Sequence, residues 1–255
     1  MGNTVLFDDG VHKNILLEDF AGEGGCAVQA NQHLIIHNGK GMILDPGGHK
    51  IYSKVLSETM NQLGGGKLEY IFLSHQDPDI VAACNGWLMT TDATAYCSEL
   101  WTRFVPHFGL DNLVADRLHG IPDEGMVLDL GGCPLLVIPA HFMHSCGNHQ
   151  VYDPASKILY TGDLGASLGQ NYVEVPDFDA HLPYMEGFHQ RYIVSNTIMR
   201  AWAAMVRNLD IETIAPQHGA IFKGKEMVER FIDWCEELEC GIDLMAAKMA
   251  IPAQA

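Results

Sequence analysis

The sequence has few basic residues and no long apolar run. Lys and Arg together number 15 against 32 Asp and Glu, which gives a net charge of −17 at pH 7. Nucleic acid and anionic membrane surfaces repel an acidic protein, so neither is an expected partner. No stretch reaches the roughly eighteen apolar residues of a membrane span. The start, Met1-Gly2-Asn3-Thr4, lacks the basic and apolar regions of a signal peptide, so we expect a soluble, cytoplasmic protein.

The sequence also lacks paired cysteines and linkers. Its seven cysteines are odd in number and scattered, with no Cys-x-x-Cys, which favours free buried thiols in a reducing compartment over a disulfide framework. No Pro/Gly/Ser-rich segment divides the chain. Because 255 residues, 47% of them hydrophobic, can bury a full core, we expect one domain over residues 1–255.

The most informative stretch that is present is Ser74-His75-Gln76-Asp77-Pro78-Asp79-Ile80, which follows the apolar run 70–73. Alternate residues of an extended or tightly turned segment point to the same side, so His75, Asp77 and Asp79 can converge on one point. Imidazole and carboxylate together suit a hard or borderline divalent or trivalent metal. Taken alone, the motif is also ordinary turn chemistry, because Asp-Pro-Asp favours turns.

Three further strand ends carry the same kinds of residue. His141 follows the apolar run 135–138, Asp163 follows 158–160, and His218 follows 212–215. Each of these ligand candidates lies near a Gly or Pro, which allows close approach of the backbone. Since α/β proteins place their chemistry beyond strand ends, four such ends at one edge of a sheet predict a metal site.

Apolar periodicity predicts the remaining elements. Asn38-Gly39 between two apolar runs indicates a tight hairpin. The segment from Gly165 to Gly187 has little periodicity, so we expect a loop or short helix over the site or against a second subunit. Further strands are predicted at 14–17, 26–29, 33–36, 42–44, 93–97, 126–130 and 150–152, and helical segments at 51–63, 79–89, 98–104, 192–209 and 225–238.

The ordered series His75-x-Asp77-x-Asp79, His141, Asp163 and His218 resembles the ligand series of the metallo-β-lactamase fold superfamily. The usual first motif of that superfamily is His-x-His-x-Asp-His; here Asp77 replaces the second His and Ile80 the last. A carboxylate in the second position is typical of the flavodiiron branch. Within that branch, the chain is most similar to the oxygen-binding diiron proteins (ODP), stand-alone relatives without a flavin domain.

The resemblance covers nearly the whole chain, from 42–48 to 217–219, and implies its architecture. We expect an α/β (α+β) fold, arranged as a four-layer αββα sandwich in one domain, with no flavodoxin domain and no FMN. By the same resemblance, His75, Asp77 and His141 hold one metal, Asp79 and His218 hold a second, and Asp163 bridges the two. Three histidines and three carboxylates favour iron, with manganese or zinc as less favoured ions.

Three nearby residues have a less definite role. The third ligand of the first metal is either His141 or His144. The flavodiiron pattern His-x-x-x-Ser fits His141 with Ser145, so His141 is the predicted ligand. His144 is then a candidate neighbour of the metal site that does not itself bind a metal. Asp45 supports the first ligand motif from behind in the superfamily, but an ordinary turn residue fits its position equally well. Ile80 leaves the second metal an open position beside an apolar neighbour.

The resemblance implies three competing functions. In the first, a non-haem diiron centre binds dioxygen and the protein reports oxygen to a signalling partner. In the second, the protein reduces O2 or NO with electrons from a separate redox protein. In the third, it is a dinuclear zinc hydrolase acting on thioesters or phosphoesters. The expected absence of a flavodoxin domain favours the oxygen sensor, and the habit of the family implies a homodimer.

Overall fold

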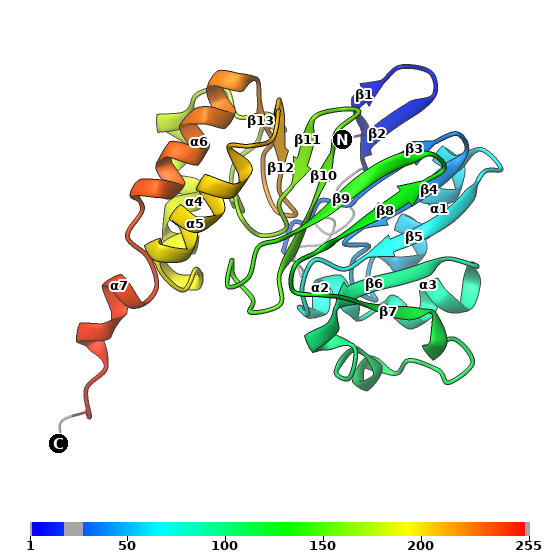
Figure 1. The fold of residues 1–255 in the computed structure, drawn as a ribbon, viewed down its shortest axis with the longest axis horizontal. Helices are drawn as coiled ribbons and strands as arrows, with labels where there is room; N and C mark the ends of the chain where they lie inside the picture. Colours follow the sequence, from blue (N-terminus) through cyan, green and yellow to red (C-terminus); the bar gives the residue numbers. More distant parts are fainter. Residues whose placement is uncertain (1, 18–27, 253–255) are drawn as a thin grey trace.

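Two β-sheets form the centre of the molecule, each built from the short apolar runs of one part of the sequence (Figure 1). The computed structural model describes residues 2–17 and 28–252. In these residues the first sheet has the order β1 (Thr4–Asp8), β2 (His12–Leu16), β3 (His33–His37), β4 (Lys40–Leu44), β5 (Lys67–Phe72), β6 (Thr94–Ser98) and β7 (Leu118–Ile121). Strands β1 to β4 pair antiparallel, and β4 to β7 pair parallel.

The second sheet is formed almost entirely by antiparallel neighbours. Its order is β13 (Phe222–Lys223), β12 (Thr213–Ala215), β11 (Ile158–Tyr160), β10 (His149–Asp153), β9 (Cys133–Pro139) and β8 (Met126–Leu130). The pair β11 and β12 is parallel, so both strands end at the same edge. The residues after these two strands are therefore brought side by side.

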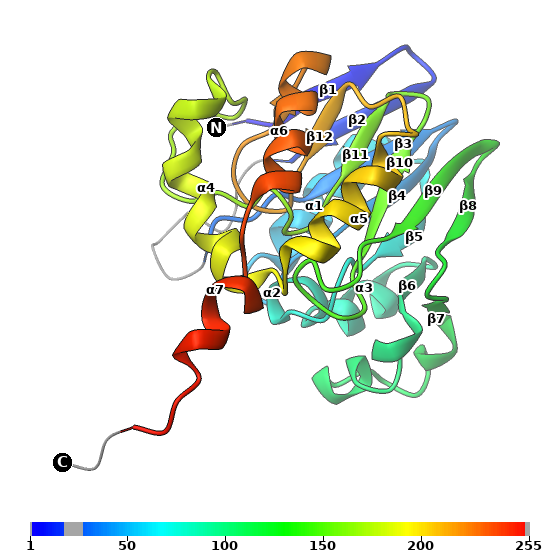
Figure 2. The same cartoon turned by 60° about the vertical axis from the view of Figure 1, so that its left-hand side comes forward.

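Helices cover the outer face of each sheet, as the two views in Figures 1 and 2 show. On the first sheet lie α1 (Tyr52–Leu63), α2 (Pro78–Val81) and α3 (Cys84–Thr90); on the second lie α4 (Phe178–Tyr192), α5 (Asn196–Val206) and α6 (Lys225–Glu237). The short helix α7 (Ile242–Met245) leads the chain away from this body. Four 3-10 helices lie in the described ranges, at Glu99–Trp101, Val105–Phe108, Ala115–Arg117 and Ala246–Lys248.

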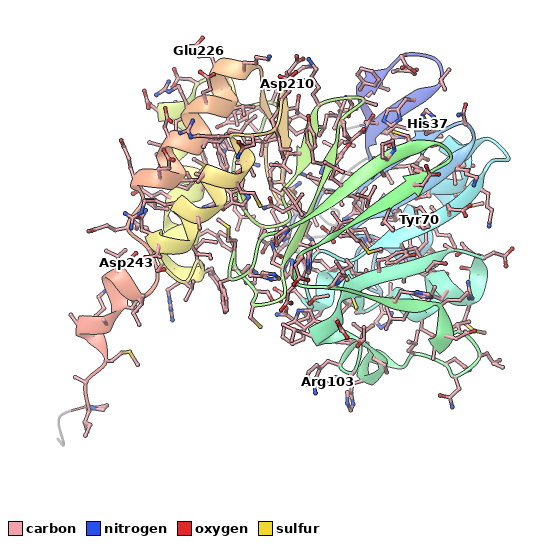
Figure 3. All side chains as sticks on the ribbon, in the orientation of Figure 1. His37, Tyr70, Arg103, Asp210, Glu226 and Asp243 are labelled. Carbon is pink, nitrogen blue, oxygen red and sulfur yellow. The ribbon has the colours of Figure 1, made fainter. Side chains whose placement is uncertain are left out.

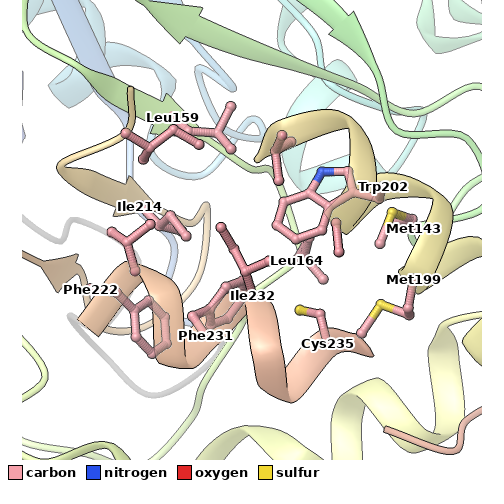
Figure 4. Packing of buried hydrophobic residues seen from close by; sticks show 14 of the residues in the cluster. Met143, Leu159, Leu164, Met199, Trp202, Ile214, Phe222, Phe231, Ile232 and Cys235 are labelled. Carbon is pink, nitrogen blue, oxygen red and sulfur yellow. The ribbon is translucent and has the colours of Figure 1, made fainter. Parts of the chain in front are cut away.

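Three apolar clusters correspond to the three interfaces between these layers. Between the sheets, side chains such as Met42 and Phe72 pack against Leu135 and Val151. A second cluster joins the first sheet to α1, α2 and α3, and a third, shown in Figure 4, joins the second sheet to α4, α5 and α6. The predicted four-layer αββα sandwich is confirmed, and its stability comes mainly from this apolar burial.

Local sequence signals account for many element boundaries. Asn38 and Gly39 have φ values of 50° and 74°, the positive pair that a two-residue hairpin turn requires, and they join β3 to β4 as predicted. Helix α1 ends at Gly64 in the left-handed conformation, where glycine has no Cβ penalty. Asp177 caps the start of α4 by accepting a hydrogen bond from Ala180 N at 2.8 Å.

Other boundaries differ from the predictions. The helix predicted at 79–89 is two short helices, α2 and α3, and the segment 98–104 contains only a 3-10 turn. The connection 165–187 holds the first ten residues of α4, whereas the stripe predicted at 192–209 begins only with α5. Strands β1, β7 and β13 were not predicted, because their residues lack clear alternation. Residues 26 and 27 of the strand predicted at 26–29 lie outside the described ranges, and residues 28 and 29 belong to no strand.

Two further expectations concern the cysteines and the membrane. All six cysteines in the described ranges are free; five of them are buried and Cys146 is exposed. Within the same ranges, every helix is too short or too polar to span a lipid bilayer.

Candidate metal centre

The predicted ligands other than His141 come together at one end of the sandwich, which we call the ligand end. The strands that carry them belong to both sheets rather than to the edge of one sheet: β5 lies in the first, and β9, β11 and β12 lie in the second. Backbone hydrogen bonds join the loops after these strands, including His149 N to Ser74 O at 3.0 Å and Gln217 N to Gly162 O at 2.7 Å. The prediction of a single sheet edge is corrected accordingly.

Close contact at Gly162 holds the loops together. Gly162 has a φ of 58°, and a Cβ at this position would lie 3.2 Å from Ser74 Oγ. A larger residue would therefore push the loop after β11 away from the loop after β5. The sequence Thr161-Gly162-Asp163 places its carboxylate beside His75 because glycine permits both the backbone conformation and the close approach.

Four side chains form the first half of the centre. Ligand atoms of His75, Asp77, His144 and Asp163 all lie within 4.8 Å of one another. His144 Nε2 lies 2.8 Å from Asp163 Oδ2 and 3.5 Å from Asp77 Oδ2, and His75 Nε2 lies 3.7 Å from each of these oxygens. This spacing suits four donors around one metal ion.

Asp79 and His218 form the second half, on the other side of Asp163. His218 Nε2 lies 3.3 Å from Asp79 Oδ2 and 3.6 Å from Asp163 Oδ1. The Gln217 amide donates to Asp79 Oδ2 at 3.2 Å and so holds that carboxylate in place. Since the two oxygens of Asp163 face different groups, this residue is placed to bridge two ions.

The structure does not bring His141 to this group. Its Nε2 lies 2.8 Å from Asp123 O, and its ring packs against His149 at a centroid distance of 5.2 Å. The loop after β9 turns back on itself, with Phe142 N donating to Ser145 O and Asn148 Nδ2 to Met143 O. This reversal points His144 at the carboxylates, so His144 replaces His141 in the proposed ligand set.

Hydrogen bonds orient two of the imidazoles. His218 Nδ1 lies 2.5 Å from Gln29 O and must carry the proton there, because a carbonyl only accepts. His75 Nδ1 lies 3.0 Å from Ser74 Oγ. With Nδ1 occupied in this way, Nε2 of each ring is left to face the centre, as in most metal-binding histidines.

Asp45 and Ile80 have different places around the centre. Asp45 is buried behind the first ligand motif, and its Oδ1 accepts a hydrogen bond from Ser74 N at 2.8 Å. Burial raises the pKa of Asp45 to about 6, although this hydrogen bond opposes the shift. Ile80 is fully buried and packs in the apolar cluster beneath α1 and α3, away from the lining of the cavity described below. Ile80 directly follows Asp79 in the chain, so its place as an apolar neighbour of the second metal stays a prediction.

The electrostatics show why a cation fits this site. Burial opposes the charge on His144 and His218, but their carboxylate neighbours outweigh it and raise their pKa values to about 10 and about 9. Burial likewise opposes ionisation of Asp163, yet His75 and His144 lower its pKa to about 2. Clustered carboxylates therefore attract positive charge, which bound metal ions supply while releasing the protons of the imidazoles.

Two buried atoms also fit metal ligation. His75 Nε2 and Asp163 Oδ1 are shielded from solvent and have no hydrogen-bond partner. A buried polar atom without a partner costs free energy, so such atoms need an explanation. Both atoms face the centre, where a metal ion would satisfy them. The donor set of three imidazoles and three carboxylates is rich in oxygen and favours iron or manganese over zinc.

A cavity of about 810 Å³ leads to the centre and is lined by five of the candidate ligands, Asp77, Asp79, His144, Asp163 and His218. Most of the remaining wall is apolar. Phe188 and Tyr192 of α4 stack at a centroid distance of 4.7 Å, and Tyr192 lies 5.6 Å from the ring of His144. The predicted helical segment 192–209 includes Tyr192 but begins after Phe188; helical spacing of four residues is the signal that links the two rings.

Comparisons with known proteins agree with this geometry. Two solved structures of the chemotaxis sensor ODP, one of a peroxy diiron species and one of the apo state from T. denticola, are each 41% identical to this chain. They have TM-scores of 0.86 and 0.84, and the alignments cover 98% and 97% of this chain and 100% and 99% of theirs.

More distant relatives are longer than this chain. The Flv1 flavodiiron core from Synechocystis has a TM-score of 0.73 at 20% identity, covering 92% of this chain and 61% of that one. An uncharacterised protein of Methanocaldococcus jannaschii is 24% identical over 226 residues, which are 86% of this chain and 56% of the relative. This chain thus spans little more than half the length of that curated relative.

One family model settles the relationship. The model described as ODP family beta lactamase matches residues 28–219, which include every candidate ligand of the centre. The chain therefore belongs to the ODP family of beta-lactamase-fold proteins.

Proposed function

We propose that this protein binds dioxygen at a non-haem diiron centre and acts as an oxygen sensor. The observation that carries the proposal is the position of Asp163, whose two carboxylate oxygens face two separate groups of His and Asp side chains. Membership of the ODP family supports it, as does 41% identity to a chemotaxis sensor solved as a peroxy diiron species.

Each half of the centre has its own ligands. His75, Asp77 and His144 would hold one iron, Asp79 and His218 would hold the other, and Asp163 lies between the two groups. When bound, a pair of ferrous ions supplies electrons and open coordination positions to dioxygen. Asp79 and His218 offer fewer protein donors than the first half, so the side of the centre near them is where a small ligand has room.

The surrounding residues fix the ligands and limit access to water. His75 and Asp163 are almost fully buried and have little freedom to reorient. Leu168, Phe188 and the ring of Tyr192 form an apolar wall on one side of the approach, while His49 and Lys50 add polar groups to the lining. The apolar wall limits the access of water to the part of the centre that it covers.

The test is anaerobic loading with ferrous iron, followed by exposure to oxygen while iron content and visible absorption are measured together. We expect two irons per chain and a new absorption band that persists without added reductant. Asp163→Ala removes the bridging carboxylate and should abolish both signals. Asp210→Ala is the matched control, because this exposed carboxylate pairs only with Lys157 and Lys225 in the described structure.

Three outcomes would overturn the proposal. Two zinc ions after native purification, with ester hydrolysis and no response to oxygen, would identify a hydrolase. Rapid consumption of O2 or NO with an added reductase would identify a reductase served by a separate electron donor. Unchanged iron content in Asp163→Ala would mean that the centre lies elsewhere.

Several expectations stay predictions alongside this proposal. They are the homodimer, the cytoplasmic location, the signalling partner, the organisation as one domain over 1–255 and the absence of FMN. Gel filtration of the iron-loaded protein tests the first, and flavin fluorescence of the purified protein tests the last.

A further inference from the structure

We propose that the opposite end of the sandwich holds a separate zinc site, formed by His12, His37 and Cys133. Their ligand atoms lie within 4.8 Å of one another. We call this group the far end. It shares no residue with the ligand end, and no part of the proposed oxygen chemistry uses it.

Strand pairing brings the three residues together. His12 begins β2 and lies directly opposite His37, the last residue of β3, so their side chains are cross-strand neighbours. Cys133 begins β9 on the second sheet, immediately after the turn Gly131-Gly132. Strand β3 begins at His33, which lies beside Pro216 at the ligand end, and it ends at His37. The two sites are therefore separated by the length of this strand. Figure 3 labels His37 at the far end.

Asp153 fixes the orientation of His12. The Nε2 atom of His12 lies 2.7 Å from Asp153 Oδ2, and both residues are almost fully buried. The carboxylate only accepts, so the proton of a neutral His12 ring lies on Nε2 and Nδ1 carries the lone pair. A carboxylate behind an imidazole is the usual support of a metal-binding histidine, because it holds the tautomer and strengthens the ligand.

The lone pair of His12 points at another imidazole nitrogen. His12 Nδ1 lies 3.2 Å from His37 Nδ1. Two lone pairs cannot face each other at this distance, so either a proton or a metal ion lies between them. Zinc-nitrogen bonds of about 2.0–2.1 Å in a tetrahedral site place neighbouring nitrogens about 3.3–3.4 Å apart. The observed separation is close to that edge length.

The third donor decides which metal fits. Cys133 is buried beside the two rings, and its Sγ belongs to the same group of ligand atoms. A metal ion bound there would displace the thiol proton and bind the thiolate. Two imidazoles and a thiolate form a softer set than the ligand end, and this set suits zinc. His37 is only half-buried, so water can complete the coordination.

The turns around the far end show what the ion would do. Asp9 Oδ1 accepts hydrogen bonds from Val11 N and His12 N, at 2.9 and 2.7 Å, and Asn38 N donates to Val11 O at 3.1 Å. The side chain of Asn38 reaches Gly131 O, at 3.4 Å, on the second sheet. A metal bound by His12, His37 and Cys133 would add a direct link between the two sheets and stabilise the folded state by mass action.

Cobalt titration of the metal-free protein tests the proposal, because the ligand end contains no thiolate among its donors. Because the ligand end can also take two cobalt ions, we expect a near-ultraviolet thiolate-to-cobalt absorption band that saturates within three equivalents and disappears when excess zinc is added. Cys133→Ser should abolish this band. Losing a residue that only hydrogen-bonds to a metal ligand lowers metal affinity by roughly 10- to 100-fold. His37→Gln removes a ligand itself, so cobalt affinity should fall by at least as much.

Two controls make the result decisive. Iron content at the ligand end and near-ultraviolet circular dichroism report whether the two variants remain folded. His37 is only partly buried, so His37→Gln still tests the site if Cys133→Ser fails to fold. Cys146→Ser removes the exposed thiol near the ligand end and should keep the band. No band in the wild type, or a band lost in Cys146→Ser and kept in Cys133→Ser, would overturn the proposal.

Discussion

The two ends of the sandwich use similar side chains in opposite arrangements. At the ligand end, carboxylates face the imidazole nitrogens directly, and His144 Nε2 lies 2.8 Å from Asp163 Oδ2. At the far end, the carboxylate of Asp153 lies behind His12, and a thiol faces the front of the ring. Where carboxylates face the ring nitrogens, they become metal donors and the site is rich in oxygen. Where the carboxylate lies behind the ring, the donors are imidazole nitrogen and thiol sulfur.

Access also differs between the two ends. The ligand end is reached through a cavity of about 810 Å³, whereas the far end is surrounded by the turns of four hairpins. An open site can exchange a small molecule, while an enclosed one serves to hold strands together. We therefore expect the two ends to respond independently when either is changed.

The largest effect is expected from removing His144. His144→Ala takes one of the four donors from the first half of the centre, so iron affinity should fall by more than the roughly 100-fold that an outer partner contributes. The cobalt band of the far end should be unchanged. The matched variant His141→Ala removes an imidazole three residues away and should keep the iron. Loss of iron in His141→Ala alone would identify His141 as the ligand.

The sequence predicted most of the ligand end because local patterns encode it. His75, Asp163 and His218 each lie three residues beyond the end of a short strand, and alternation places Asp77 and Asp79 after His75. Strand-end placement is a local property, so it can be recognised without knowing how the strands pair. The same holds for the hairpin at Asn38-Gly39, which requires two positive φ angles.

Long-range contacts determined what the sequence could not predict. The choice of His144 depends on a loop reversal that is held by Asn148 and by the bond from His149 N to Ser74 O, between segments 75 residues apart in the chain. The far end was not predicted at all, because His12, His37 and Cys133 lie on three strands of two sheets. No periodicity in the sequence indicates that these strands meet.

The next prediction concerns Asp153, the carboxylate behind His12 at the far end. Asp153→Asn removes the charge behind His12, so the affinity of the far end for cobalt should fall by about 10- to 100-fold, with iron content unchanged. Asn offers one acceptor oxygen in place of two, so it cannot keep every hydrogen bond that Asp153 accepts from Asn14, Ser156 and Ala155 N, and the thermal midpoint should also fall. Asp8→Asn, an exposed carboxylate of β1 near the same turns, serves as the control. Equal cobalt affinity in both variants would show that Asp153 does not orient His12.

A buried histidine that belongs to neither proposed metal site shows what burial alone does to the pH dependence of stability. His189 is fully buried, accepts a hydrogen bond from Gly165 N at 2.8 Å and donates to Met185 O at 2.7 Å. Burial lowers its pKa from 6.5 to about 4. The unfolded chain takes up a proton below pH 6.5 and the folded chain does not, so stability is full above that pH and is lost as the pH falls toward 4.

This shift has a measurable size. Between pH 7 and pH 5, His189 should account for a loss of about 2 kcal/mol in the free energy of unfolding. Urea titrations of the metal-free protein at the two pH values measure it, and His189→Gln should reduce the difference by about that amount. His107→Gln changes an exposed histidine and should keep the wild-type difference. An undiminished difference in His189→Gln would mean that His189 is not held neutral.

The smallest expected effect concerns the support behind the ligand end. Asp45 accepts from Ser74 N, next to His75, but touches none of the metal-binding nitrogens. Asp45→Asn keeps an oxygen for this bond and removes only the charge, so iron affinity should fall by no more than about tenfold. Asp45→Ala leaves Ser74 N buried without a partner, which costs about 1–3 kcal/mol of stability. If Asp45→Asn instead released iron as fully as His144→Ala, Asp45 would act as a metal ligand and not as a support behind His75.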